Sequence, residues 1–469
     1  MGLPLRKTKI FARFVRTMDT LGPFEKFPHI AVAVSGGGDS NALVYLANEW
    51  VKSVGGQLTA LTVDHGLRNG SRSEAQGVGL WIKALGVPHQ ILKWEGQKPK
   101  SQIQALARDA RYQLMEDWCK ENVVLHLFLG HTQNDQAETY LMRKGHGSGP
   151  DGLAAMSQIV EFTNCRILRP LLPENTTDLR VFLKNQKAKW VEDPSNQDEK
   201  YERVRIRLRI QDEKISCRNM AMAAAQFGTD RLHRSNELSA FIACAVDLNP
   251  SGFAYIDLSR IPPVSDDLIL RLFARLLTTI GGRPYGPSKS QLGPRLKEFM
   301  DKNISSITSS GCQIIRKRDG YLVVREQRWL PMPIRVQSGQ TIHWDRRFRM
   351  TFGPALSMCK GDAVVRPFEN ADWASIKLRM DKIKLVKVGA VIRRSLPVIS
   401  DDRGIFAMPH LGALRSEFTS YQDNIGNILT HLSFCPLNSM SDMGFSVASP
   451  MKPTISVSQS GLAIEHNLI

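Results

Sequence analysis

The glycine-rich stretch SGGGDS at residues 35–40 constrains the fold of this chain more than any other feature of its sequence. The preceding residues 30–34 (IAVAV) are apolar and typical of a strand that is buried on both faces. Beyond the stretch, apolar residues at positions 42, 43, 46, 47 and 50 fall on one side of a helix. The sequence therefore predicts a strand, a glycine-rich loop and a helix in direct succession.

Such a loop is suited to bind phosphate. Glycines 36–38 permit positive φ and close backbone approach, and the N–H groups at a helix start attract anions. Ser35 and Ser40 add hydroxyl donors, and Asp39 adds a carboxylate that is expected to hold Mg²⁺. The stretch lacks the Gly-Lys-Ser/Thr of a Walker A loop and the G-x-G-x-x-G dinucleotide fingerprint. We predict a phosphate site, and the alternative is an ordinary strand–turn–helix connection.

Composition narrows the class of protein. A chain of 469 residues is too long for one ordinary core, so two or three domains are expected. No run approaches the ~18 apolar residues of a membrane span, which favours a soluble protein. The formal charge of +17 favours a polyanionic partner such as nucleic acid over a generic basic surface. Seven scattered cysteines without a C-x-x-C predict reduced thiols and a cytoplasmic location.

Strand-like and helix-like segments alternate up to about residue 172. Strands are expected at 30–34, 58–63, 89–94, 123–130 and 165–172, and helices at 73–85, 103–120 and 179–186, after a lead-in helix with apolar residues at 10, 14 and 18. This alternation predicts an α/β fold with a doubly wound parallel sheet. Ligands bind at the carboxyl ends of such strands, so the loop, Asp64-His65 and residues 131–138 are expected to converge.

Residues 201–210 (YERVRIRLRI) alternate arginine with apolar residues. The period of two is that of a strand, but a helix also groups Arg203 with Arg207 and Arg205 with Arg209. The pattern leaves both structures open. Four arginines with few acids favour phosphate contacts, and a solvated face is the alternative.

The motifs beyond the loop carry a family resemblance. SGGGDS resembles SGGxDS, the pyrophosphate-binding (PP) loop of the N-type ATP pyrophosphatases, which have an adenine-nucleotide alpha hydrolase-like fold. The full ordered set over residues 28–210 resembles the tRNA(Ile)-lysidine synthase family. Its further members are VDHGLR (63–68), ARDARY (107–112), GHTQNDQAET (130–139), GSGPDGLAAM (147–156), RPLL (169–172) and WVEDPSNQDEKYERVRIR (190–207).

The resemblance implies an ATP-dependent ligase that forms a C–N bond. ATP and Mg²⁺ adenylate the C2 oxygen of the wobble cytidine, position 34, in a tRNA(Ile) with a CAU anticodon. The ε-amine of free L-lysine then displaces AMP, and the product lysidine changes codon reading to AUA and aminoacylation from Met to Ile. No membrane partner is implied, and a homodimer is left open.

It also implies roles for residues and domains. Catalysis is expected from Asp39, Asp135, Glu138 and Arg111, with Asp39 and Asp135 as metal ligands. The expected nucleotide-binding residues are Ser35, Gly36, Gly37, Gly38, Asp39, Ser40, Asp64 and His65, and the tRNA-binding residues are Arg108, Arg203, Arg205 and Arg207. The expected domains are 1–215 (catalytic), 216–330 (helical linker and middle tRNA-binding domain), 331–436 (C-terminal α+β tRNA-binding domain, with RRSLPVI at 393–399) and 437–469 (flexible tail).

Several of these residues have a simpler alternative role. Asp64 and Asp135 are also suited to cap helices, Glu138 to be a surface acid, and His65 and His131 to form local hydrogen bonds. The chain departs from the family pattern at four positions, Thr132, Asn134, His146 and Val204.

Three other functions remain open. They are a tRNA thiolase, a synthetase of the GMP-synthetase or argininosuccinate type, and an RNA-binding protein that retains the fold without catalysis.

Overall fold

The computed structural model describes residues 4–66, 70–95, 103–191, 199–260, 264–301, 304–377, 389–411, 413–415, 427–440 and 444–448. The chain divides into two compact units, Met1–His233 with Met443–Ile469, and Arg234–Asp442. The division falls inside helix α9 (Cys217–Ala245). The domain boundaries drawn after residues 215, 330 and 436 stay predictions.

The first unit is built on a six-stranded sheet with the strand order β3-β2-β1-β4-β6-β5. Neighbouring strands run parallel except for β5, which pairs antiparallel with β6 at the edge. The doubly wound parallel sheet is therefore confirmed, and the antiparallel edge strand is an addition. The strands are β1 (His29–Ala33), β2 (Gln57–Asp64), β3 (His89–Lys93), β4 (His126–Phe128), β5 (Ile159–Glu161) and β6 (Arg166–Leu168).

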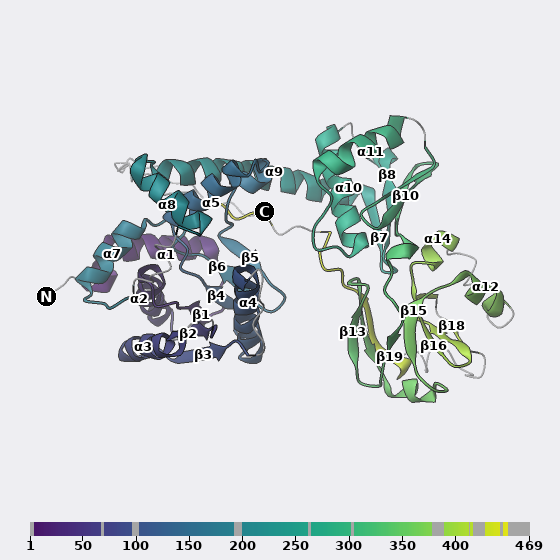
Figure 1. Cartoon of the computed structure of the whole chain (residues 1–469), viewed down its shortest axis with the longest axis horizontal. Helices are drawn as coiled ribbons and strands as arrows, with labels where there is room; N and C mark the ends of the chain where they lie inside the picture. Colours follow the sequence, from purple (N-terminus) through teal and green to yellow (C-terminus); the bar gives the residue numbers. More distant parts are fainter. Residues whose placement is uncertain are drawn as a thin grey trace, which may run out of the picture. The chain divides into compact units, whose positions relative to one another are not determined.

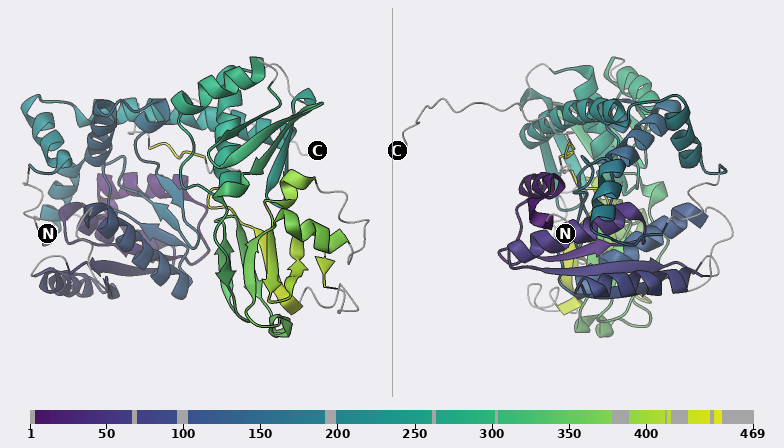
Figure 2. Two further views of the ribbon diagram at one scale, coloured as in Figure 1. Left: turned by 45° about the vertical axis from the view of Figure 1, so that its right-hand side comes forward. Right: turned by 90° about the vertical axis from the view of Figure 1, so that its left-hand side faces the viewer.

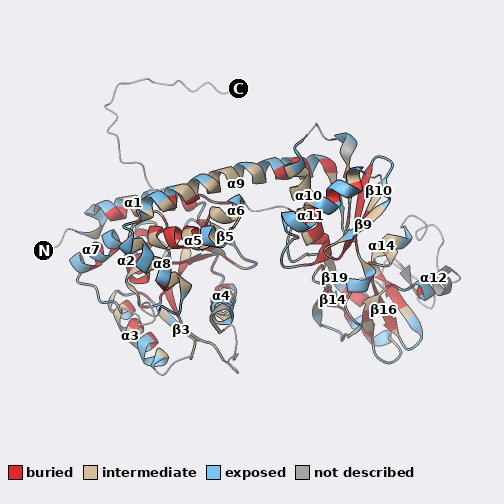
Figure 3. Ribbon diagram, turned by 45° about the horizontal axis from the view of Figure 1, so that its top comes forward, coloured by how far each residue is buried: buried red, intermediate tan, exposed pale blue. Residues whose placement is uncertain are grey.

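Alternate residues of β1 face two different cores. Ile30 and Val32 pack with α1, α2, α3 and α7, whereas Ala31 packs with α4 on the other face. The sheet accordingly lies between α2 and α4 (Figure 1), and its strands are buried beneath helices whose outer sides are exposed (Figure 3). The helices of this unit are α1 (Lys9–Leu21), α2 (Gly38–Ser53), α3 (Ser71–Ala84), α4 (Ile103–Glu121), α5 (Gln133–Gly145), α6 (Pro150–Leu153), α7 (Thr176–Asn185) and α8 (Glu202–Asp212), followed by α9.

The predicted helices and strands agree with these elements within a few residues, with two refinements. The expected strand at 123–130 is regular only over β4. The arginine-rich segment 201–210 is helical, in α8, so the helix is the correct one of the two structures that its pattern allowed. The predicted lead-in helix is α1, with Ile10, Phe14 and Met18 buried on one side.

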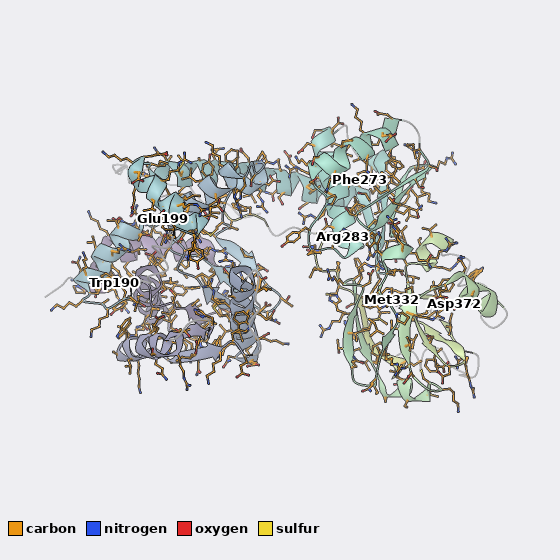
Figure 4. The ribbon with its side chains drawn as sticks, in the orientation of Figure 1. Trp190, Glu199, Phe273, Arg283, Met332 and Asp372 are labelled. Carbon is orange, nitrogen blue, oxygen red and sulfur yellow. The ribbon has the colours of Figure 1, made fainter. Side chains whose placement is uncertain are left out.

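The described residues of the second unit form three antiparallel sheets. A five-stranded sheet (β7-β8-β11-β10-β9) packs against α10 and α11, and Phe273 of α10 lies in this core (Figure 4). The later strands form sheets β12-β15-β16-β17-β18 and β13-β14-β19 (Figure 2). The elements are β7 (Val246–Asn249), β8 (Phe253–Asp257), α10 (Asp266–Gly281), α11 (Lys289–Asp301), β9 (Ser306–Ser309), β10 (Cys312–Lys317), β11 (Gly320–Arg325), β12 (Ile334–Arg335), β13 (Thr341–Trp344), β14 (Phe348–Phe352), β15 (Val364–Pro367), α12 (Asn370–Lys377), α14 (Ala390–Arg393), β16 (Pro397–Asp401), β17 (Gly404–Met408), β18 (Ala413–Leu414) and β19 (Leu429–Phe434).

Part of the expected flexible tail is packed. Phe445 is buried against α9, where Arg231 stacks on its ring, and the Ser446 carbonyl oxygen accepts a hydrogen bond from the Gln158 N–H at 2.9 Å. The expectation of flexibility is therefore wrong for residues 444–448 and for the buried Met440, while residues 441–443 and 449–469 lie outside the described part. Among the described helices, none is long and apolar enough to cross a lipid bilayer.

Candidate active site

The glycine-rich loop connects β1 to α2 and closes on itself through a serine. Ser40 Oγ donates to the Gly37 carbonyl oxygen at 2.9 Å and accepts from the Ser35 N–H at 3.3 Å. Gly36 has a φ of +85°, and a Cβ at this position would lie 2.7 Å from Val78 Cγ2. Gly37 caps α2, so the first N–H groups of the helix face the loop. The loop is thus shaped to receive an anion.

Gly130, after β4, lies directly against this loop. A Cβ on Gly130 would be 3.0 Å from Ser40 Cα and 3.3 Å from the carbonyl carbon of Asp39. Both neighbours are backbone atoms, which cannot move aside without displacing the start of α2. The absence of a side chain therefore lets the segment after β4 approach the loop.

Asp39 presents a buried carboxylate oxygen to the site. Its Oδ2 accepts from Thr176 Oγ1 at 3.4 Å, and its Oδ1 is buried without a hydrogen-bond partner among the described residues. Burial and the nearby Asp135 carboxylate raise the pKa of Asp39 to about 6, and Arg180 and Arg207 oppose this shift. An unpaired acid oxygen with a raised pKa is the environment that a bound cation relieves.

Asp135 is already engaged by protein donors. Its Oδ2 accepts from the Thr132 N–H at 2.9 Å, and its Oδ1 accepts from Arg203 Nη2 at 3.0 Å. The first bond belongs to a capping box at the start of α5, in which Asp135 is the third helical residue and Thr132 is the N-cap. Asp39 consequently has more free capacity for a metal than Asp135 has.

Glu138 is the most firmly held acid of the site. Its side chain is 4% exposed, its Oε2 accepts from Arg203 Nε at 2.6 Å, and its Oε1 accepts from Arg207 Nε at 2.5 Å. The two arginines reach the same carboxylate because they are four residues apart on one face of α8. The alternative role of Glu138 as a surface acid is therefore wrong. Arg203 and Arg207 contact carboxylates while about a third of each side chain stays exposed.

Three predicted binding residues lie outside the cavity wall, namely Gly36, Asp64 and Arg205. Arg205 is exposed, and its Nη1 donates to the Glu199 carbonyl oxygen at 2.8 Å, just before α8 (Figure 4). Asp64 Oδ1 accepts from Ser71 Oγ at 2.6 Å and from the Gly66 N–H at 3.1 Å, bonds that lower its pKa. These contacts fit the capping alternative for Asp64.

The remaining predicted residues meet in one cavity of about 1370 Å³. Arg111 and Arg108 reach it from α4, and Arg108 Nη2 also donates to Tyr112 Oη at 3.0 Å. Gly36 does not line the cavity, although its carbonyl oxygen accepts from the Val191 N–H at 2.9 Å. The predicted residues that line it are Ser35, Gly37, Gly38, Asp39, Ser40, His65, Arg108, Arg111, Asp135, Glu138, Arg203 and Arg207.

Sequence reasoning missed several residues of the cavity wall. Thr176 and Arg180 come from α7, and Trp190 follows that helix with its ring near Gly38 (Figure 4). Cys217, at the start of α9, also lines the cavity. Trp190 opens the motif at 190–207 but was given no role, and no local pattern marks Thr176, Arg180 or Cys217, which reach the site only through the packing of helices distant in sequence. Residues 192–198 of the motif at 190–207 lie outside the described residues.

The four departures from the family pattern have local partners or local packing. Thr132 caps α5, and Asn134 Oδ1 accepts from the Thr176 N–H at 3.1 Å. His146 Nε2 lies 2.8 Å from Glu202 Oε1, and Val204 is buried on α8, a helix that packs on α5.

Together, the parallel sheet, the glycine-rich loop after β1 and the acids facing it define a PP-loop enzyme of the ATP-pyrophosphatase class. The family model described as "PP-loop domain" matches residues 8–214. The chain is 36% identical to the tRNA(Ile)-lysidine synthase of Wolbachia pipientis wMel over 331 residues, which are 69% of this chain and 76% of that protein.

Two further relatives are similar over most of their length. The tRNA(Ile)-lysidine synthases of Orientia tsutsugamushi (strain Boryong) and Rickettsia bellii (strain OSU 85-389) are 29% and 30% identical over 415 and 417 residues. These matches cover 86% and 85% of this chain and 93% and 96% of the relatives. The chain belongs to the tRNA(Ile)-lysidine synthase family. The predicted family, and the prediction of a ligase with an ATP-binding PP-loop domain, are confirmed.

Proposed function

We propose that this chain joins the ε-amine of free L-lysine to C2 of cytidine 34, the wobble nucleotide of a tRNA(Ile) with a CAU anticodon. ATP first adenylates the C2 oxygen, and lysine then displaces AMP, so that the products are lysidine, AMP and pyrophosphate. The modified tRNA reads AUA and is charged with isoleucine instead of methionine. The shared name of the relatives supports this substrate, and a tRNA substrate supports action in the cytoplasm.

One observation carries the proposal. A phosphate-binding loop and a buried carboxylate held by two guanidinium groups line the same cavity of about 1370 Å³. The reaction needs a nucleotide, a nucleobase and an amino acid in one space, and a pocket for a single small ligand measures roughly 300–1,000 Å³. The cavity is large enough for more than one substrate.

The loop supports the ATP half of the reaction. The N–H groups at the start of α2, with Arg180 of the neighbouring helix α7, are suited to hold the phosphates as negative charge develops on the leaving pyrophosphate. Asp39 Oδ1, buried without a partner among the described residues, fits a Mg²⁺ ligand. Mg²⁺ takes few protein carboxylates and completes its shell with phosphate oxygens and water, and it neutralises charge on the leaving phosphates. Within the described residues no group of three or more acid, His or Cys side chains is arranged to hold a metal.

The acids of α5 support the lysine half. Glu138 and Asp135 offer negative charge to an ammonium group, and Glu138 is positioned to accept its proton. Arg203 and Arg207 place positive charge around the same carboxylate, which lowers the pKa of an amine bound there and favours the neutral, nucleophilic form. Arg111 and Arg108 on α4 are suited to hold the nucleotide or the cytidine from the other wall.

The test is a mass analysis of nucleosides from a CAU-anticodon tRNA(Ile) transcript incubated with the protein, ATP, Mg²⁺ and lysine. We expect lysine on the wobble cytidine with the unaltered chain and none with Asp39→Ala. Glu213→Gln, which changes an exposed acid of the α8 region outside the cavity wall, is the control that should keep full activity.

Two other outcomes have distinct meanings. Release of AMP without lysine transfer would leave the PP-loop class standing and refute the proposed substrate. If neither reaction occurs while the tRNA still binds, a non-catalytic RNA-binding protein becomes the better interpretation.

A further inference from the structure

A histidine on the cavity wall is held by an arginine that the proposed chemistry does not use. Arg169 Nε donates to His131 Nδ1 at 3.1 Å, and Arg169 Nη1 donates to the Ser157 carbonyl oxygen at 2.6 Å. Arg169 is buried just after β6, and His131 lines the cavity just after β4. The guanidinium is therefore anchored on one side and fixes the imidazole on the other.

This contact sets the tautomer of His131. A guanidinium group has only donors, so Nδ1 must accept the hydrogen bond and cannot carry a proton. Burial lowers the pKa of His131 to about 3, although the charge of Asp135 opposes the shift, so the ring is neutral near pH 7. The single ring proton is then on Nε2. His131 offers a donor at Nε2 and has no means of turning it into an acceptor.

The locked donor points to no partner in the part of the chain that the structure describes. Among the described residues no hydrogen bond to Nε2 is present, and the ring lines the cavity. His131 follows Gly130, which packs on the backbone of Asp39 and Ser40. The ring thus lies one residue beyond the segment that touches the phosphate loop, where a phosphate and a base oxygen have to meet in the proposed reaction.

The neutral state of the ring favours a base over a phosphate as its ligand. Arg111 and Arg180 already supply positive charge to the cavity, and a phosphate gains more from such cations than from an uncharged N–H. A neutral N–H donor of fixed direction is suited to a neutral acceptor atom that is present in one base and absent from another. The ring nitrogen N3 of a pyrimidine is such an acceptor in cytosine, whereas in uracil N3 carries a proton and donates.

We propose that His131 reads N3 of the target pyrimidine through Nε2–H and thereby selects cytosine over uracil, with Arg169 as the positioning residue that keeps Nε2 a donor. This inference rests on the proposed function and deepens it. With uracil, two N–H groups would face each other and both would lose their acceptor. An unsatisfied buried donor costs more than the absence of one hydrogen bond, so the rejection is strong.

The decisive variants differ only in what they present to His131 Nδ1. Arg169→Lys keeps a group that only donates, so the tautomer stays locked. Arg169→Gln presents an amide that donates or accepts, which frees the ring to place its proton on Nδ1 and to accept at Nε2. Arg166→Gln is a matched control, because Arg166 lies on β6 and donates to the Leu21 and Pro23 carbonyl oxygens away from the cavity.

The assay compares two transcripts that differ only at position 34. The kcat/KM for the transcript with C34 is measured by pyrophosphate release, and the transcript with U34 is added as a competitive inhibitor. We expect weak inhibition by U34 with the unaltered chain, Arg169→Lys and Arg166→Gln. With Arg169→Gln we expect the preference for C34 over U34 to fall by about 10- to 100-fold, as the removal of one unsatisfied donor predicts. Tighter binding of U34 is a gain that misfolding cannot imitate.

The tautomer is also observable directly. In protein labelled with ¹⁵N-histidine, His131 should give a protonated Nε2 signal and an unprotonated Nδ1 signal that do not change between pH 5 and 8. Unprotonated Nε2 would overturn the inference whatever the kinetics. Equal losses with C34 and U34 in Arg169→Gln would also overturn it, and would leave the proposed function intact. No reaction of the unaltered chain with C34 would instead refute the proposed function.

Discussion

Replacing Glu138 by glutamine tests whether the acid of the site also holds α8 in place. The Glu138 side chain is 4% exposed and accepts from Arg203 Nε at 2.6 Å and from Arg207 Nε at 2.5 Å. Removing one partner of a buried ion pair costs about 3–5 kcal/mol. The two arginine side chains are 35% and 36% exposed, so water stabilises part of their charge, and we expect about 2–3 kcal/mol.

Hydrogen exchange read by mass spectrometry measures this cost where it arises. In Glu138→Gln, amides of residues 202–212 should exchange about 30- to 150-fold faster. This factor corresponds to the expected loss of about 2–3 kcal/mol, since 1.36 kcal/mol is a factor of ten in the rate. Amides of β1 and β2, which do not contact Glu138, should keep their protection. Pyrophosphate release should persist while lysine transfer falls, because the ATP half of the site is unchanged.

The control is Glu213→Gln, since Glu213 pairs with Arg209 on the exposed side of the same region. Both side chains of this pair lie in water, so exchange in α8 should not change measurably. If Glu138→Gln also leaves α8 protected, the two arginine contacts do not hold the helix and the reasoning from burial is wrong. If both variants loosen α8 equally, the cause is general loss of charge rather than the buried pair.

Three further predictions concern single residues. Asp39→Asn should abolish pyrophosphate release yet raise the melting temperature in EDTA at pH 8. Because the pKa of Asp39 is raised to about 6 in the folded chain, its ionisation lowers the free energy of unfolding by about 2–3 kcal/mol above that pH. A stability difference between the two chains that does not grow between pH 4 and 8 contradicts this. Gly130→Ala should weaken ATP binding in calorimetry by about 10-fold or more, because its Cβ meets the backbone of Ser40, whereas Gly145→Ala, with open space around it, should not. Burial lowers the pKa of His410 to about 4 from an unfolded 6.5, so its contribution to stability is complete above pH 6.5 and falls by about 2 kcal/mol at pH 5. In urea unfolding measured at each pH, His410→Asn should reduce this loss of stability. An unchanged slope of stability against pH would exclude His410 as its source.

Much of the first unit was predictable because its polar motifs come directly after its strands. Strands β1 and β4 each end in a polar segment, so the position of SGGGDS after β1 and of residues 131–138 after β4 was enough to expect them together. The antiparallel strand β5 had no such signal, since three residues are too few to show a period. Its direction is decided by pairing with β6.

The arginines of α8 show what a single sequence leaves undecided. Arginine at every second position fits a strand, and the same spacing puts Arg203 and Arg207 on one face of a helix. The deciding partner is Glu138, some 65 residues earlier, which accepts from both only if they are four residues apart on a helix. The same limit applies to Arg169, an ordinary member of the RPLL motif until β6 brings it to His131. A local pattern specifies which groups a segment can offer, and the fold specifies which of them face each other. The role of a charged residue can therefore be assigned only after the side chain that it contacts in the fold is known.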